Sequence, residues 1–296
     1  MTRTLCLKVD VCTHDGMRHG VPRLLEHLER LAAKATFCLA FGPDNSGKAI
    51  LNVFKPGFAK KMLGSGAPSL YGWRTMVSGT LLSARPIASA FPDLVRRIEG
   101  EGHEVALHAW DHRRWQDHVD AMDDAEIRAH YERAAASYAE ILGHAPLGAG
   151  AAAWIVNARS LAVQDALHLA WSSDLRGGAP CRLREGGRVF ATPQVPTTGR
   201  CVEELLAVGI RETKALADAL ASDLAPAEVA VFAVHAEVEG GPYAAVLDSL
   251  LPRLREGRDV RTIGEFVASI DVASLPVRDL AYTALPGRSG RVATAR

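Results

Sequence analysis

The stretch His103-Glu-Val-Ala-Leu-His108-Ala-Trp-Asp-His112 is the part of this chain from which the rest can be interpreted. Its apolar run predicts a buried strand that delivers two histidines, four residues apart, to its carboxyl end. In α/β folds that end of the sheet is where ligands and metals are bound. Imidazole is the commonest side-chain ligand of catalytic divalent metals, and two histidines on one helical turn can share an ion. Because the chain has 11 histidines in 296 residues, a surface pair on a helix is the other interpretation.

Two further predicted strands also end in residues that suit a metal site. Residues 5–11 form an apolar strand, and the period of two along a strand places Asp10 and Cys12 on the same side. Residues 228–235 form a near-continuous apolar run, typical of a buried parallel strand, which ends at His235. Each residue has a structural alternative: a buried hydrophobe for Cys12, a helix cap for Asp10 and a hydrogen-bonded strand end for His235. Because three predicted strands end in residues of this kind, we favour a metal site with an acid–base pair beside it.

Strand and helix patterns alternate along the chain, which predicts one α/β barrel-like domain over residues 1–284. The predicted helices span residues 21–34, 92–100, 123–142, 158–167 and 243–256. The remaining predicted strands span residues 35–41, 104–108, 147–154 and 169–173, with a short one near residue 260. Residues 285–296, rich in Gly, Arg and Ala, are expected to be a disordered tail.

The charge balance excludes one class of partner. Lys plus Arg and Asp plus Glu each number 34, so the chain has no overall field to recruit nucleic acid. The first residues run directly into a strand, without the apolar stretch of a signal peptide or membrane span. The five cysteines are scattered and never in CxxC spacing, so we expect no disulfide framework and a reducing, cytoplasmic location.

Residues 44–90 interrupt the strand–helix alternation. This segment carries Lys48, Lys55, Lys60 and Lys61 among apolar residues, with no acidic residue between Asn45 and Pro92. One interpretation is a pair of short helices that pack their apolar stripes on the barrel. The other is a basic flap that touches the inner membrane surface or a lipid-phosphate substrate.

The order of these motifs resembles the polysaccharide deacetylase superfamily, carbohydrate esterase family four. The resemblance covers residues 4–265 and rests on Asp10-Val-Cys12, His108-x-x-x-His112, Ala-Ala-Ala-Trp154, Ser173-Asp174-x-Arg176-Gly177 and His235-Ala-Glu-Val-Glu-Gly240. Within the superfamily the chain is similar to the deformylases of amino sugars carried on undecaprenyl phosphate. The phrases Gly42-Pro-Asp-Asn45, Tyr71-Gly-Trp73 and His108-Ala-Trp-Asp-His112 carry this closer likeness.

The resemblance implies a distorted (β/α) barrel with seven or eight parallel strands. It implies an enzyme that needs a divalent metal and removes a formyl or acetyl group from an amino sugar. Asp10 would be the general base and His235 the general acid, while Cys12, His108 and His112 would hold the metal. The implied substrate-binding residues are Tyr71, Trp73, Trp154, Asp174, Arg176, Glu237 and Glu239. Of these, Trp154, Asp174 and Arg176 could instead stand behind the catalytic groups.

The chain departs from the family pattern at two positions. Cys12 stands where the family has a metal-binding aspartate; a thiolate binds zinc at about 2.3 Å, so the site would favour zinc, or cobalt, over magnesium. Ile155 stands where the family has the arginine that holds the base, so Asp10 would need another partner such as Arg113 or Arg176. Two functions therefore remain open: an N-deacylase, or a catalytically inactive member of the fold that binds a sugar-lipid.

Overall fold

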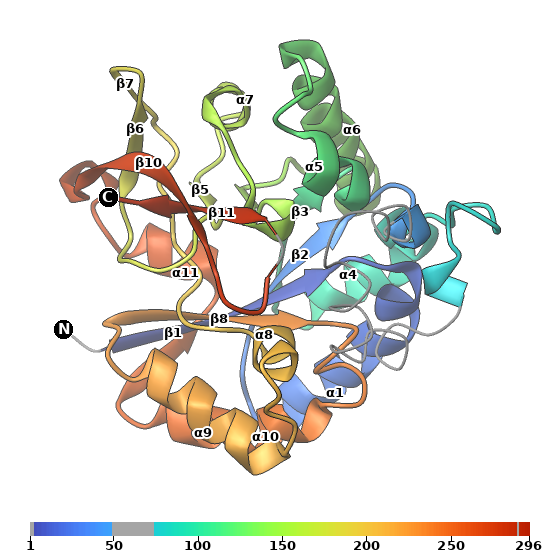
Figure 1. The fold of residues 1–296 in the computed structure, drawn as a ribbon, viewed down its shortest axis with the longest axis vertical. Helices are drawn as coiled ribbons and strands as arrows, with labels where there is room; N and C mark the ends of the chain where they lie inside the picture. Colours follow the sequence, from blue (N-terminus) through green and yellow to red (C-terminus); the bar gives the residue numbers. More distant parts are fainter. Residues whose placement is uncertain (1–2, 49–73, 289) are drawn as a thin grey trace.

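The main sheet curls into a half-barrel, as the resemblance implies (Figure 1). A computed structural model describes residues 3–48, 74–288 and 290–296. Within this part of the chain the sheet has seven strands, all paired in parallel, in the order β5-β4-β3-β2-β1-β8, with β9 beside the first half of β1. The strands are β1 (Arg3–Val11), β2 (Thr36–Ala40), β3 (Glu104–Ala109), β4 (Gly148–Ala149), β5 (Trp171–Ser172), β8 (Val229–His235) and β9 (Arg258–Arg261).

The predicted helices are all present, with small shifts at their ends. They are α1 (Val21–Arg30), α4 (Pro92–Gly100), α6 (Asp124–Leu142), α7 (Ala158–Ala166) and α10 (Ala244–Arg255). Local chemistry explains the bounds of α6: Asp123 and Glu126 form a capping box at its start, and Gly143, at φ 81°, ends it. The structure adds η1 (Gly16–Gly20), η3 (Ala88–Ala90), α5 (His112–His118), η4 (Ala152–Trp154), α8 (Val202–Ala207), α9 (Thr213–Leu224), α11 (Ile263–Ala268) and η5 (Val272–Ser274).

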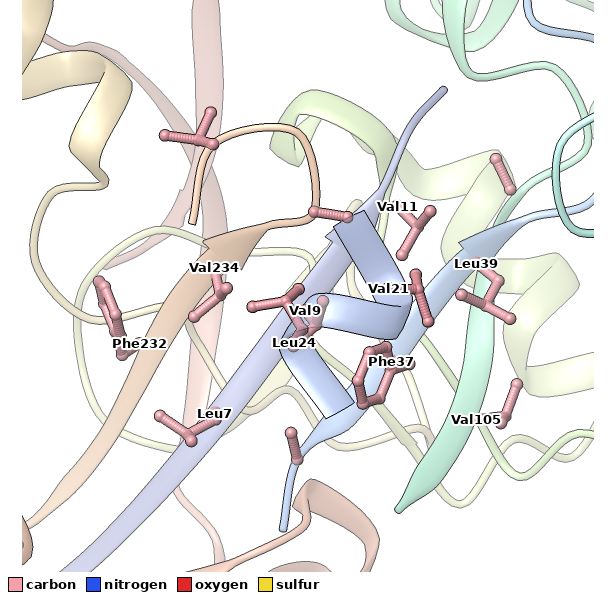
Figure 2. Packing of buried hydrophobic residues seen from close by; sticks show 14 of the residues in the cluster. Leu7, Val9, Val11, Val21, Leu24, Phe37, Leu39, Val105, Phe232 and Val234 are labelled. Atoms are coloured by element: carbon pink, nitrogen blue, oxygen red, sulfur yellow. The ribbon is translucent and has the colours of Figure 1, made fainter. Parts of the chain in front are cut away.

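The side chains of β1 point alternately to two faces of the sheet, one in the hydrophobic core and one toward the candidate site. Its odd-numbered residues, such as Leu7 and Val9, pack against α1 together with Phe37 and Phe232 of the neighbouring strands (Figure 2). Its even-numbered residues Cys6, Lys8 and Asp10 therefore share the opposite face, inside the curled sheet, and Cys12 follows directly after the strand. Burying one face of β1 under helices thus fixes which side chains reach the site.

The carboxyl-terminal residues are ordered, which corrects the expected disordered tail. Strand β10 (Val277–Ala284) pairs antiparallel with β11 (Arg291–Ala295) in a second sheet of order β11-β10-β6-β7 among the described residues. Strands β6 (Arg182–Glu185) and β7 (Arg188–Val189) complete it (Figure 1). Val292 of β11 is buried against Trp154, and Ala293 is fully buried. Burial of these small apolar residues offsets the entropy that a Gly- and Arg-rich segment loses on ordering.

The base of the 44–90 segment is built from its two described ends, residues 44–48 and 74–90. The N–H of Asp44 donates to the carbonyl of Arg85 at 2.8 Å, and that of Gly47 to the carbonyl of Ser78 at 2.9 Å. The two short helices predicted here fall mainly on residues 49–73, outside the described part of the chain. No helix in the described ranges has both the length and the hydrophobicity to cross a membrane.

Candidate metal and catalytic site

Parallel strand register brings the predicted site residues together. Asp10 of β1 lies opposite His235 of β8, so these two side chains leave neighbouring strands at the same level. Cys12 follows β1 directly, and its Sγ lies 3.6 Å from Nε2 of His108, on β3. The ligand atoms of Cys12, His108 and His112 all lie within 4.8 Å of one another. His112 is the first residue of α5, so the histidine pair spans a strand end and a helix start rather than one helical turn.

Backbone contacts orient His108 toward Cys12. Its Nδ1 lies 2.8 Å from the carbonyl oxygen of Gly150, which can only accept, so Nδ1 carries the proton and Nε2 is free. Burial lowers the pKa of His108 to about 4. Burial and the neighbouring His108 hold the pKa of His112 well below its ordinary value. Both imidazoles are therefore neutral near pH 7, the state in which histidine binds a metal.

The surroundings of Cys12 keep its sulfur protonated in the absence of a cation. Burial, followed by the Glu237 and Asp10 carboxylates, raises the pKa of the Cys12 thiol well above its ordinary value. Its backbone N–H donates to Oε1 of Glu237 at 3.1 Å, which holds the loop after β1 in place. One sulfur and two neutral nitrogens at this spacing fit zinc or cobalt, since either ion favours the thiolate. The residues present therefore suit the divalent metal that the motifs suggested.

Asp10 is held by a residue that the sequence interpretation overlooked. Nζ of Lys8 lies 2.7 Å from Oδ2 of Asp10, and both side chains are almost completely buried. Burial alone would raise the pKa of Asp10, but Lys8, with His108 and His235, outweighs it and the pKa of this carboxyl is lowered. The other oxygen, Oδ1, has no hydrogen-bond partner and lies 3.9 Å from Nδ1 of His108. Asp10 thus combines an ionised carboxylate with one uncommitted oxygen, which a general base requires.

The partners expected for Asp10 are engaged elsewhere, which is a correction. Nε of Arg113 donates to Asp117, one turn later in α5, at 2.7 Å. Arg176 forms a two-pronged ion pair with Glu204, at 2.7 and 2.9 Å. Neither arginine is the partner of Asp10.

His235 has its own buried carboxylate. Its Nδ1 lies 3.0 Å from Oε1 of Glu203, the second residue of α8. Burial would lower the pKa of His235, but Glu203, then Asp10 and Glu239, raise it to about 9. The imidazole is therefore a cation near pH 7, and Nε2 can give up its proton. Its backbone N–H donates to Oε2 of Glu239 at 2.8 Å, which fixes the strand end.

The described residues that were expected to contact substrate are buried inside the protein. Asp174 is fully buried and accepts hydrogen bonds from the Ala151 N–H and the amides of Gln164 and Gln194. The others, each at most 7% exposed and packed or bonded inside the protein, are Trp154, Arg176, Glu237 and Glu239. This burial favours the supporting role that the resemblance left open for Trp154, Asp174 and Arg176, and substrate contact by Glu237 and Glu239 stays a prediction. Tyr71 and Trp73 lie outside the described residues.

Comparison with known proteins agrees with this geometry. The family model for polysaccharide deacetylase matches residues 3–167, more than half of the 296-residue chain. The chain belongs to the polysaccharide deacetylase family. It is thus a hydrolase of amide bonds, with a fold and a set of strand-end residues that suit that chemistry.

Individual relatives extend over nearly the whole chain. A "Probable 4-deoxy-4-formamido-L-arabinose-phosphoundecaprenol deformylase ArnD" of Shewanella sediminis is 30% identical over 289 residues, covering 96% of this chain and 92% of the relative. A protein classed as a polysaccharide deacetylase from Mycobacterium smegmatis has a crystal structure with a TM-score of 0.65, 16% identity and 96% coverage of both chains. A family-four pseudoenzyme from Bacillus anthracis has a TM-score of 0.53, 13% identity, and coverage of 90% of this chain and 66% of its own. These two structures share the fold.

Proposed function

We propose that this family member is a metal-dependent N-deacylase that removes a formyl or acetyl group from an amino sugar. The observation that carries the proposal is the spacing of the donor atoms. Cys12, His108 and His112 place one sulfur and two neutral nitrogens within 4.8 Å, beside the neighbouring pair Asp10 and His235. A Lewis acid, a base and an acid are the three groups that hydrolysis of an unactivated amide needs.

The roles follow from the charge state of each group. When bound by Cys12, His108 and His112, a divalent cation supplies Lewis acidity that polarises the carbonyl and acidifies water. Asp10, ionised and with Oδ1 uncommitted, takes a proton from the attacking water. His235, cationic through its contact with Glu203, donates a proton to the departing amine. The products are the free amino sugar and formate or acetate.

A lipid-linked sugar is the substrate that we propose within this class. Its support is the relative from Shewanella sediminis, which is named for a formamido sugar on phosphoundecaprenol and aligns over 96% of this chain. The lysines at positions 48, 55, 60 and 61 add basic charge to a chain of zero formal net charge. Each basic residue near an anionic membrane contributes about 1 kcal/mol, so this segment would bring the enzyme to its lipid.

A substrate panel tests the proposed class. The zinc- or cobalt-loaded protein is incubated with N-formyl and N-acetyl amino sugars, free and as undecaprenyl phosphates, and released formate and acetate are measured. We expect release from at least one lipid-linked sugar, and faster turnover than of the free sugar. Binding to anionic vesicles should fall when Lys48, Lys55, Lys60 and Lys61 become Gln. Equal turnover of free and lipid-linked sugars would contradict the proposed lipid linkage but not the N-deacylase activity.

The second candidate function is an inactive member of the fold that binds a sugar-lipid. Two departures from the family pattern favour it: Cys12 replaces the metal-binding aspartate, and Ile155 replaces the arginine that holds the base. On this alternative the protein binds the lipid-linked sugars of the panel but releases neither formate nor acetate, whichever metal is supplied.

A further inference from the structure

The fold buries one lysine inside the curled sheet, next to the catalytic groups. Lys8 lies on β1 two residues before Asp10, so these two share one face of the strand, and Cys12 follows directly after it. Its side chain is fully shielded from solvent, and its Nζ lies 2.7 Å from Oδ2 of Asp10. A buried ammonium is costly unless it is paired and its position is closely fixed.

The space around Lys8 fits the extended side chain. Its Nζ lies 5.1 Å from the centre of the Trp154 ring, a cation–π contact on a second side. A β-carbon added at Gly150 would lie 2.7 Å from Cε of Lys8, so the glycine leaves the room that the lysine fills. The carbonyl of that same glycine accepts from Nδ1 of His108. Gly150 therefore lies against the side chains of both Lys8 and His108.

We propose that Lys8 is the positioning residue of the general base: it holds Oδ2 of Asp10 and leaves Oδ1 free to accept the proton from the attacking water. The inference rests on the proposed N-deacylase function. Three observations support it. The contact is made within one strand, Oδ1 has no hydrogen-bond partner, and the arginines Arg113 and Arg176 are paired elsewhere.

Kinetics of the metal-loaded enzyme can distinguish positioning from mere packing. Lys8→Met is expected to lower kcat by about 100-fold, the lower range for losing effective general-base catalysis, with KM and bound metal unchanged. Lys8→Arg keeps a charged donor and should retain more activity than Lys8→Met. The surface variant Lys34→Met, whose side chain is exposed, is the matched control and should behave as wild type.

Lys8→Met leaves the buried Asp10 carboxylate without its partner, and this variant could fail to fold for that reason. A double variant keeps the proposal testable in that case. Asp10→Asn removes the base, and adding Lys8→Met to it also removes the buried charge. If Lys8 acts through Asp10, the double variant has the same kcat as Asp10→Asn, because the two effects are not additive. A further loss of about 100-fold from Asp10→Asn to the double variant would overturn the assignment, as would an active Lys8→Met enzyme with wild-type kcat. A wild type without turnover would instead overturn the proposed function and this inference together.

Discussion

Nδ1 of His235 lies 3.0 Å from Oε1 of Glu203, although the two residues come from β8 and α8 and are separated by 32 positions. The contact engages one of the two ring nitrogens of His235. Because Glu203 takes Nδ1, the opposite nitrogen, Nε2, is left to donate. Glu203 and Asp10 together raise the pKa of His235 to about 9 against the effect of burial. The proposed acid is therefore already protonated at neutral pH.

The activity is expected to fall at alkaline pH as His235 loses its proton. For the metal-loaded enzyme, kcat/KM should decline with an apparent pKa near 9. In Glu203→Gln the attraction of the carboxylate is lost, so the alkaline limb should move toward neutral pH. Glu212→Gln, at an exposed position, is the control and should leave the profile in place. If the alkaline limb does not move in Glu203→Gln, Glu203 does not set the pKa of the catalytic acid.

The metal-free protein is expected to lose stability in acid because His108 must take up a proton. Its folded pKa of about 4 lies below the ordinary value of 6.5, so the unfolded chain binds the proton more tightly. Stability from this group is complete above pH 6.5 and is lost as the pH falls toward 4. A change of two to three pKa units corresponds to about 3 kcal/mol in the free energy of unfolding. Urea unfolding at pH 7 and 4.5 measures it, and the difference should shrink in His108→Gln.

Removing either histidine of the proposed metal set should abolish metal binding. His108→Ala and His112→Ala each take one of three donors from the group within 4.8 Å. Loss of one ligand lowers metal affinity by orders of magnitude, so bound metal and activity should both disappear after dialysis. His144→Ala is the control, since that side chain is about half exposed and pairs with Glu99. Retention of a full metal complement in either variant would exclude that histidine from the site.

The role of Cys12 can be tested by its softness as a ligand. Cobalt bound to its thiolate should give a sulfur-to-metal charge-transfer band, which Cys12→Ala should lose. Cys12→Asp should bind a harder, more Lewis-acidic metal and turn over faster. Cys38→Ala, which removes a buried thiol on β2, is the control and should keep the band. If the band and the activity survive Cys12→Ala, the cysteine is a packing residue.

The sequence predicted the strands that carry the site because their apolar runs are buried on both faces. Leu7 and Val9 face the helices, and the alternation that buries them places Asp10 inside the sheet. The second sheet was not predicted. Its strand β6 contains Arg182 and Arg184, is partly exposed, and pairs in parallel with β10 almost 100 residues away. Such pairing depends on tertiary contacts rather than on local pattern.

The supporting residues of the site were harder to predict than the ligands. Lys8 resembles a polar residue at the edge of a strand, although its spacing of two from Asp10 was a signal that it shares the inner face. Glu203 had no such signal, since α8 is a short helix far from His235 in sequence. The tail was misjudged from composition, because the burial of Val292 against Trp154 cannot be seen in a Gly- and Arg-rich segment.

The most direct test of the central claim is the dependence of amide hydrolysis on metal occupancy. The protein is stripped with a chelator, reloaded with zinc or cobalt in steps, and assayed for formate or acetate release from an N-acylated amino sugar. We predict no turnover without metal, and turnover that rises linearly until one ion per chain is bound. Turnover that persists in the stripped protein, or a fully loaded protein that hydrolyses no N-acyl sugar, would contradict a metal-dependent N-deacylase built on Cys12, His108 and His112.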